Sequence, residues 1–243
     1  MTPLFLLAAA ATATPSAQPV RSFEACAALV KSDPDQAVAA AEAWRVTDGG
    51  LSARQCLGLA YAALGRFMPG AVAFEQAARV AEAQQDARAS DLWTQAGNAY
   101  LLGGEPAKAR TAFDSALAQP GGSDGWRGEI RIDRARAAVD MGDLAAARSD
   151  LDEALKLTPG DPVGWLLSAT LARREGKIER AAQDISQAER LAPDDAAILV
   201  EAGNIAALSG DQEGARGKWT AAIARAPGSP AANAAAALAA NID

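Results

Sequence analysis

The side chains that could do chemistry in this 243-residue chain do not form a recognisable catalytic set. There is no histidine, which removes the commonest general base and metal ligand. Two cysteines cannot by themselves build a four-ligand zinc site. No phosphate-binding loop, dinucleotide fingerprint, G-x-S-x-G or metal-binding spacing occurs. The sequence therefore predicts a protein that is not an enzyme and that uses no cofactor and no metal.

Carboxylates are the remaining candidates for acid or base chemistry. None of them comes with a second acid, a nucleophile and a base in a known motif, and charged positions on helices are normally solvated. We therefore expect the central aspartates to lie near helix starts or on exposed faces; these are Asp91, Asp133, Asp140, Asp150 and Asp152.

Composition and charge narrow the class of protein further. Half of the residues are apolar, yet aromatic residues make up only 5%, and alanine dominates. Such a composition suits closely packed helices. The net charge of −7 argues against nucleic acid as a partner, because that binding depends on clustered Lys and Arg. It favours a self-repelling, soluble monomer.

The elements of the chain follow a 34-residue period. Gly142, Gly176 and Gly210 mark it, and the residues around them repeat at the same spacing. A glycine lets the chain reverse after one helix, small residues let the second helix pack closely, and proline stops that helix. The repeated positions after each glycine are a small residue (Ala147, Ala181, Ala215), a bulky residue (Leu151, Ile185, Trp219), alanine (Ala154, Ala188, Ala222) and proline (Pro159, Pro193, Pro227).

This pattern resembles the tetratricopeptide repeat, a helix-turn-helix unit whose copies stack into a solenoid. The third copy carries the fullest match, with Trp93, Gly97, Tyr100, Gly104, Ala109, Phe113 and Ala116. The resemblance implies an all-α, right-handed solenoid of about six helix pairs with a C-terminal capping helix. It also implies a non-catalytic scaffold that binds a protein or peptide partner. The alternative is a structural or self-assembly module with no ligand in its groove.

We expect the chain to begin with a signal peptide (1–17). The resemblance divides the remainder into a divergent first repeat (18–50), repeats two and three (51–127), repeats four to six (128–229) and a capping helix (230–243). Two irregular spacings flank the third repeat. We expect the first to lengthen a helix through Arg79 to Arg88, where no breaker occurs. We expect the second to be a loop, Pro120 to Gly125, which is an alternative binding face.

The first residues are typical of a secretory signal peptide. Residues 1–20 carry no charged side chain, and an apolar run from Leu4 to Leu7 precedes small residues that suit cleavage. We therefore expect export to a bacterial periplasm, and the alternative is a disordered tail on a cytoplasmic protein. Cys26 comes too late after the apolar run for a lipid anchor.

Members of the family hold their ligands in a concave groove lined by the first helix of each pair. The repeat register places mostly polar residues there, which suit a peptide backbone; these are Gln55, Thr94, Asn98, Arg136, Thr170, Arg173 and Asn204. The two arginines offer bidentate contacts to a peptide carboxylate, or they pair with local Asp and Glu. The alternative for the whole set is ordinary solvated residues.

The stack also implies a covalent link. Cys26 and Cys56 fall on the first helices of adjacent repeats, which the solenoid places side by side, so they are candidates for a disulfide. Two buried free thiols are the alternative. The lack of a C-x-x-C motif counts against thiol-disulfide catalysis.

Overall fold

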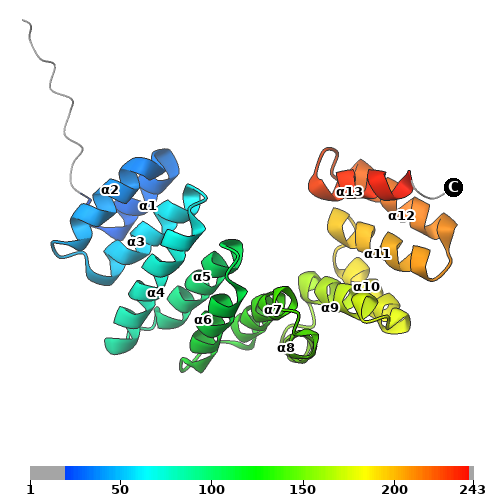
Figure 1. Ribbon diagram of the computed structural model, residues 1–243, viewed down its shortest axis with the longest axis horizontal. Helices are drawn as coiled ribbons and strands as arrows, with labels where there is room; N and C mark the ends of the chain where they lie inside the picture. The colour runs from blue at the N-terminus through cyan, green and yellow to red at the C-terminus, as the bar shows by residue number, and fades with distance from the viewer. Residues whose placement is uncertain (1–19, 241–243) are drawn as a thin grey trace, which may run out of the picture.

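A stack of paired helices makes up the whole of the described chain. The computed structural model describes residues 20–240, so the predicted signal peptide lies outside the described residues. Those residues form thirteen α-helices and no strand. In Figure 1 the helices stack into an arc that runs from blue α1 to red α13. The all-α solenoid that the repeat predicts is therefore confirmed.

The helices come in six pairs followed by a single helix. The pairs are α1 (Phe23–Ser32) with α2 (Pro34–Arg45), α3 (Gly50–Ala63) with α4 (Phe67–Ala83), α5 (Ala89–Leu102) with α6 (Pro106–Ala118), α7 (Asp124–Asp140) with α8 (Leu144–Leu157), α9 (Pro162–Arg174) with α10 (Ile178–Leu191), and α11 (Ala196–Leu208) with α12 (Gln212–Arg225). The last helix is α13 (Pro230–Ala239). In Figure 1, α4, α6 and α8 follow the outer side of the arc, and α3, α5 and α7 follow its inner side.

The glycines of the 34-residue period end the first helices. Gly142, Gly176 and Gly210 have φ values of 77°, 73° and 86°, a left-handed conformation that glycine adopts at little cost. The residue after each glycine donates its N–H to a carbonyl five residues earlier. For example, Asp143 N lies 2.9 Å from Ala138 O. This closure satisfies carbonyls at the helix end and reverses the chain.

The small and bulky repeat positions form the seam between paired helices. Ala147 and Ala154 on α8 are fully buried, and Leu151 between them is 1% exposed. The glycines inside the first helices are equally constrained, because a Cβ at Gly97 would lie 2.5 Å from Cε1 of Phe113. The sequence pattern therefore specifies how closely each pair packs.

Helix starts follow the predicted capping residues. The carboxylate of Asp161 accepts from the N–H of Val163 at 2.8 Å, and Pro162 is the first residue of α9. Ser229 caps α13 in the same way, accepting from the N–H of Ala232 at 3.1 Å. The C-terminal helix packs against α11 and α12 and covers the end of the stack, as expected.

The expected extension of a helix through Arg79 to Arg88 is wrong. Helix α4 ends at Ala83, and Gln85 takes a positive φ of 55°. The N–H of Asp86 then bonds to the carbonyl of Ala81 at 2.8 Å, which is the closure that glycine makes elsewhere in the chain. The sequence hid this turn, because a glutamine occupies the left-handed position.

The loop predicted from Pro120 to Gly125 ends two residues earlier, at Ser123. Helix α7 begins at Asp124, so Gly125 lies inside its first turn. The hydroxyl of Ser123 caps it by accepting from the N–H of Trp126 at 3.2 Å. A serine cap followed by an acidic residue is a strong helix start, and it outweighs the glycine that follows.

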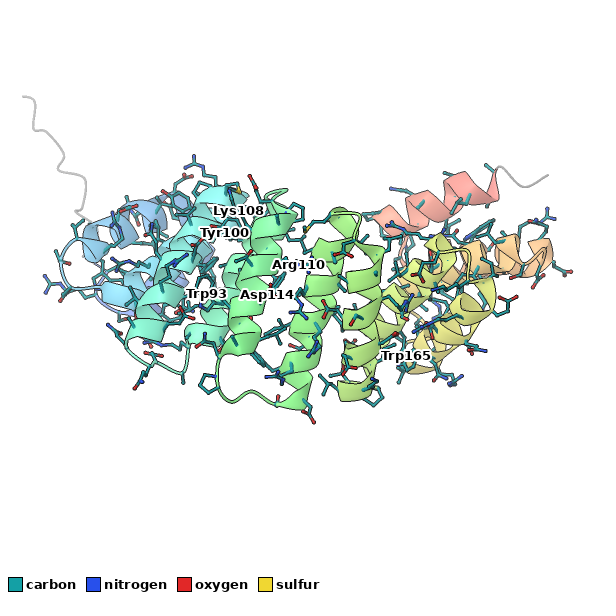
Figure 2. All side chains as sticks on the ribbon, turned by 60° about the horizontal axis from the view of Figure 1, so that its bottom comes forward. Trp93, Tyr100, Lys108, Arg110, Asp114 and Trp165 are labelled. Carbon is teal, nitrogen blue, oxygen red and sulfur yellow. A yellow bond between two sulfur atoms is a disulfide. The ribbon has the colours of Figure 1, made fainter. Side chains whose placement is uncertain are left out.

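One of the central aspartates is buried, contrary to expectation. Asp150 in the middle of α8 is 5% exposed, and both of its oxygens accept from Arg134, at 2.5 and 2.9 Å. Arg134 also pairs with Asp114 of α6 at 2.6 Å, and Figure 2 labels Asp114 on the face turned forward from Figure 1. A buried carboxylate needs such partners. Arg134 therefore ties three successive helices, α6, α7 and α8, together.

The same two positions pair again one repeat later. Ser168 and Asp184 lie 34 residues after Arg134 and Asp150, and the Ser168 hydroxyl donates to the Asp184 carboxylate at 2.6 Å. Arg148 joins this pair, donating to the Ser168 hydroxyl at 2.7 Å. The buried polar groups of repeats four and five thus follow the period of the fold.

Candidate functional site

The predicted groove residues occupy successive first helices. Gln55 lies on α3, Thr94 and Asn98 on α5, Arg136 on α7, Thr170 and Arg173 on α9, and Asn204 on α11. Arg136 is exposed, and the other six are partly buried. The sequence register therefore places these side chains along one line of helices.

Several of these polar groups are already bonded within the protein. The hydroxyl of Thr94 donates to the Ser90 carbonyl at 3.0 Å, and that of Thr170 donates to the Leu166 carbonyl at 2.9 Å. Both bonds lie within one helix, so each hydroxyl keeps its acceptor capacity for another group.

Asn98 and Arg136 meet at a carboxylate that the sequence reasoning did not assign to the groove. Arg136 donates to Asp133 at 2.5 Å, and Asn98 hydrogen-bonds the same carboxylate from α5. Burial raises the pKa of Asp133, and the nearby Arg136 and Asn98 only partly oppose this rise. Asp133 is thus half-buried in the middle of a helix, which corrects the expectation of a solvated position.

A second carboxylate organises the C-terminal end of the line. Glu201 on α11 is 6% exposed and accepts from Arg173 at 2.6 Å and from the amide of Asn204 at 3.2 Å. The amide oxygen of Asn204 in turn accepts from Trp219 at 3.3 Å. Arg173 therefore connects two repeats and follows the local-pair alternative, whereas Asn204 connects α11 to α12 within one repeat.

A small pocket opens between α7 and α9. Its volume is about 120 Å³, and its walls are mostly apolar. Arg136 and Thr170 from the predicted set line it, as do Asp140 and Arg174, which form no ion pair within residues 20–240. The apolar part of the lining is Ala135, Val139, Leu151, Leu167 and Leu171. Such a pocket suits one aliphatic side chain between two charged groups.

A larger hollow of about 560 Å³ lies where α1, α3 and α5 meet. Gln55 lines it, and Gln95 lines it from α5. The side-chain Oε1 of Gln95 is buried and has no hydrogen-bond partner. We call this the N-terminal hollow. The remaining lining is Arg21, Ser22, Phe23, Glu24, Trp44, Ser52, Arg88 and Asp91.

The groove residues that the sequence did not predict occupy equivalent positions in their repeats. Gln95, Asp133 and Glu201 each lie three residues before a predicted groove residue, namely Asn98, Arg136 and Asn204. The prediction took the row four residues earlier. With 3.6 residues per turn, both rows face the same side of a helix, so the period itself could have identified them.

Another hollow, about 540 Å³, lies between the second helices α4 and α6. Trp93 and Tyr100 form its floor, and Figure 2 labels both with Lys108 near Tyr100. Arg79 lies 5.5 Å from the Trp93 ring centroid, and Lys108 lies 5.8 Å from that of Tyr100. The two cations thus lie over aromatic side chains that are themselves buried in the core.

The structure joins Cys26 and Cys56 by a disulfide. Their Cα atoms are 6.0 Å apart, within the usual range for such a bond, and both side chains are fully buried. The bond connects α1 to α3. The bond is next in sequence to the N-terminal hollow, because Gln55, which lines the hollow, directly precedes Cys56.

Residues 20–240 contain no group of three or more His, Cys, Asp and Glu side chains placed to hold a metal. Within the same range, none of the helices combines the length and apolar character needed to cross a bilayer.

Comparison with known proteins agrees with the fold. A family model described as tetratricopeptide repeat matches residues 132–169 and 166–230. No curated protein gives a significant match. Among solved structures, PilW, described as a widely conserved type IV pilus biogenesis factor, is 19% identical with a TM-score of 0.70, covering 87% of this chain and 94% of its own.

Two further solved structures are similar. PilF of Pseudomonas aeruginosa is 15% identical with a TM-score of 0.68, covering 89% of this chain and 95% of its own. YrrB, described as a TPR protein with an unusual peptide-binding site, is 17% identical with a TM-score of 0.55, covering 81% of this chain and 96% of its own. At these identities the likeness concerns the fold.

Proposed function

Because the chain belongs to the tetratricopeptide repeat family, we propose that it is a non-catalytic scaffold that binds a segment of a partner protein along its first helices. The fold suggests a protein-interaction scaffold in general. The finer proposal is that the occupied surface runs from the N-terminal hollow, past Asn98 and Arg136, to the pocket between α7 and α9.

The pocket between α7 and α9 is the observation that carries this proposal. Its lining is mostly apolar, and Asp140 and Arg174 beside it have no ion-pair partner within residues 20–240. An aliphatic side chain of the partner would fill it, and the unpaired charges would select the neighbouring residues. The pocket is preformed by packed helices, so little ordering cost falls on the scaffold.

We also propose that the protein acts outside the cytoplasm, in a periplasm. The apolar N-terminal run and the Cys26–Cys56 disulfide support this compartment, because disulfides persist in oxidising environments. N-terminal sequencing of the protein from a fractionated bacterial host tests it. An intact Met1 in the cytoplasmic fraction would contradict export.

Binding can be tested without knowing the partner. Purified protein is used to select peptides from a random 12-residue display library, and affinities of the enriched peptides are measured by calorimetry. Thr170→Phe fills the pocket and should weaken binding at least about tenfold, which corresponds to about 1.4 kcal/mol. Thr220→Phe, at an exposed position of α12, is the matched control and should leave affinity unchanged.

Two results would contradict the proposal. One is a library that yields no peptide, combined with light scattering that shows an oligomer persisting at low concentration; this would favour a self-assembly module. The other is a peptide whose affinity is the same for the Thr170→Phe variant, which would move the site away from this pocket, for example to the 120–125 segment.

A further inference from the structure

The N-terminal hollow is polar where the pocket between α7 and α9 is apolar. Its walls carry two side-chain amides, Gln55 from α3 and Gln95 from α5, on neighbouring first helices. Neither amide makes a hydrogen bond within residues 20–240. Each amide offers both a donor and an acceptor, which is the complement of a peptide group.

Gln95 has the more unusual environment. Its Oε1 is removed from water, yet no N–H or O–H group of the described chain donates to it. Buried side-chain acceptors are nearly always satisfied, because an unmade hydrogen bond in a buried place costs stability. In the unbound protein this acceptor lies beside a hollow of about 560 Å³, where a ligand could supply the missing donor.

Two other polar groups around this hollow are already paired. Arg88 at the rim donates to the Asp86 carboxylate at 2.6 and 2.9 Å, and it reaches the Ser52 hydroxyl at 3.4 Å. The Ser22 hydroxyl accepts from the N–H of Ala25 at 3.2 Å and caps α1. The charged groups Arg21, Glu24 and Asp91 also line the hollow. The two glutamines are the side-chain amides among its lining residues, and each offers both a donor and an acceptor.

We propose that the N-terminal hollow is a backbone-reading subsite, in which Gln55 and Gln95 pair with peptide groups of an extended segment of the partner. This inference rests on the proposed function and deepens it. The pocket between α7 and α9 selects a side chain, whereas the amides hold the chain direction and tolerate many sequences. The occupant is an internal extended segment, since the unpaired Oε1 of Gln95 needs a donor, which a backbone N–H supplies and a terminal carboxylate lacks.

The length of the occupant follows from the fold. The N-terminal hollow lies between α3 and α5, and the apolar pocket lies between α7 and α9, two repeats further on. If successive first helices are on the order of 10 Å apart, an extended chain of about six residues spans the two subsites. Peptides shorter than this reach only one of them.

The test uses a peptide selected from the display library and the variant Gln95→Met, which keeps the length of the side chain but removes the amide. Binding to the variant should weaken about tenfold, whereas the thermal midpoint of the free variant should be equal to or higher than that of the wild type, because an unpaired buried acceptor is lost. Gln183→Met on α10, at an exposed position, is the control and should change neither value.

N-methylation of the peptide gives an independent readout. Methylating the backbone nitrogen that pairs with Gln95 should weaken binding to the wild type, and the same peptide should show no further loss on Gln95→Met. Full affinity of the selected peptide for Gln95→Met, with affinity lost in Thr170→Phe, would overturn this inference and leave the proposed function standing. A lower thermal midpoint of free Gln95→Met would assign Gln95 a structural role and would also overturn it. Full affinity for both variants would overturn the inference and the proposed function together.

Discussion

Arg173 on α9 and Glu201 on α11 form a two-point ion pair across adjacent repeats. Nε of Arg173 lies 2.6 Å from Oε1 of Glu201, and Nη2 lies 3.2 Å from Oε2. Glu201 is 6% exposed, and the Arg173 side chain is 25% exposed. Such paired geometry gives direction as well as attraction. The pair therefore fixes the spacing of two first helices, α9 and α11, near the C-terminal end of the stack.

Changing Glu201 to glutamine should both weaken the fold and free a cation. The unfolding free energy should fall by about 1–2 kcal/mol, less than for a fully buried pair because water reaches Arg173. Urea titration measures this fall, with exposed Glu213→Gln on α12 as the control. Selected peptides with an acidic residue should bind Glu201→Gln more tightly. Equal stability of the two variants would show that the pair contributes nothing.

The half-buried Asp133 should make stability depend on pH in an unusual direction. Burial raises its pKa in the folded protein. A carboxyl group with a raised folded pKa contributes stability below its unfolded pKa, and this contribution is lost as pH rises through the folded pKa. Asp133→Asn stays neutral throughout. As pH rises from about 3 to about 7, the Asp133→Asn variant should therefore become more stable relative to the wild type.

Glu75 provides the opposite case for the same measurement. Burial alone would raise its pKa, but hydrogen bonds from Tyr100 and Arg79 outweigh burial and lower the pKa. A lowered folded pKa contributes stability above the unfolded pKa, and this is lost as pH falls. As pH rises over the same range, the Glu75→Gln variant should thus become less stable relative to the wild type. Urea titrations at both pH values decide the matter, and slopes of the same sign for the two variants would contradict this assignment.

Much of the fold follows from the sequence because its determinants are local and periodic. Gly142 with Ala147 and Leu151 specifies a reversal and a packing seam within ten residues, and the next repeats restate them. The turn at Gln85 did not follow, since glutamine is not a typical left-handed residue and its position depends on the closing hydrogen bond from Asp86 to Ala81. Local propensity does not encode that bond.

The candidate site was less predictable than the fold. The register placed Asn98 and Arg136 on the first helices, but it could not show that Asp133 joins them across two helices. Nor could it show that the amide of Gln95 has no partner, because this depends on which side chains surround it in three dimensions. Repeats determine where a side chain lies on its helix, whereas contacts between repeats decide what it does.

Overpacking one seam position tests the register directly. Ala181 is fully buried on α10, where the first helix of the pair packs closely. Replacing it by leucine should lower the unfolding free energy by about 1–3 kcal/mol, since a dense core has no room for the added carbons. Gln183→Ala, at an exposed position two residues away, should stay within about 0.5 kcal/mol. Equal urea midpoints for the two variants would refute the seam.

The buried Asp150 should matter far more than an exposed ion pair. Asp150→Ala leaves Arg134 with only Asp114 and removes the link that Arg131 makes at 3.4 Å, so we expect a loss of about 3 kcal/mol. Asp194 pairs with Arg225 at 2.8 Å, but both side chains are more than half exposed. Asp194→Ala should therefore cost less than about 1 kcal/mol. A comparable loss for both variants in urea would show that burial does not set the value of Asp150.

The disulfide should account for a large part of the stability of the first repeat. Cys26 and Cys56 close a loop across a sequence separation of 30, which in the chain-entropy model stabilises the fold by roughly 3–4 kcal/mol. Reduction should therefore lower the urea midpoint of the transition that involves α1 and α2. The double variant Cys26→Ala with Cys56→Ala should match the reduced protein and lose its response to reductant, because both thiols are gone.

Thiol titration of the denatured, unreduced protein checks the bond itself. Protein isolated from the periplasm should show no free thiol and a monomeric mass, whereas two free thiols per chain would contradict the disulfide. Helix α1 also contributes Phe23 to the N-terminal hollow. Reduction of the disulfide should therefore lower both the stability of the first repeat and the affinity for a selected peptide. Unchanged affinity after reduction would show that α1 is not needed for the subsite that Gln55 and Gln95 form.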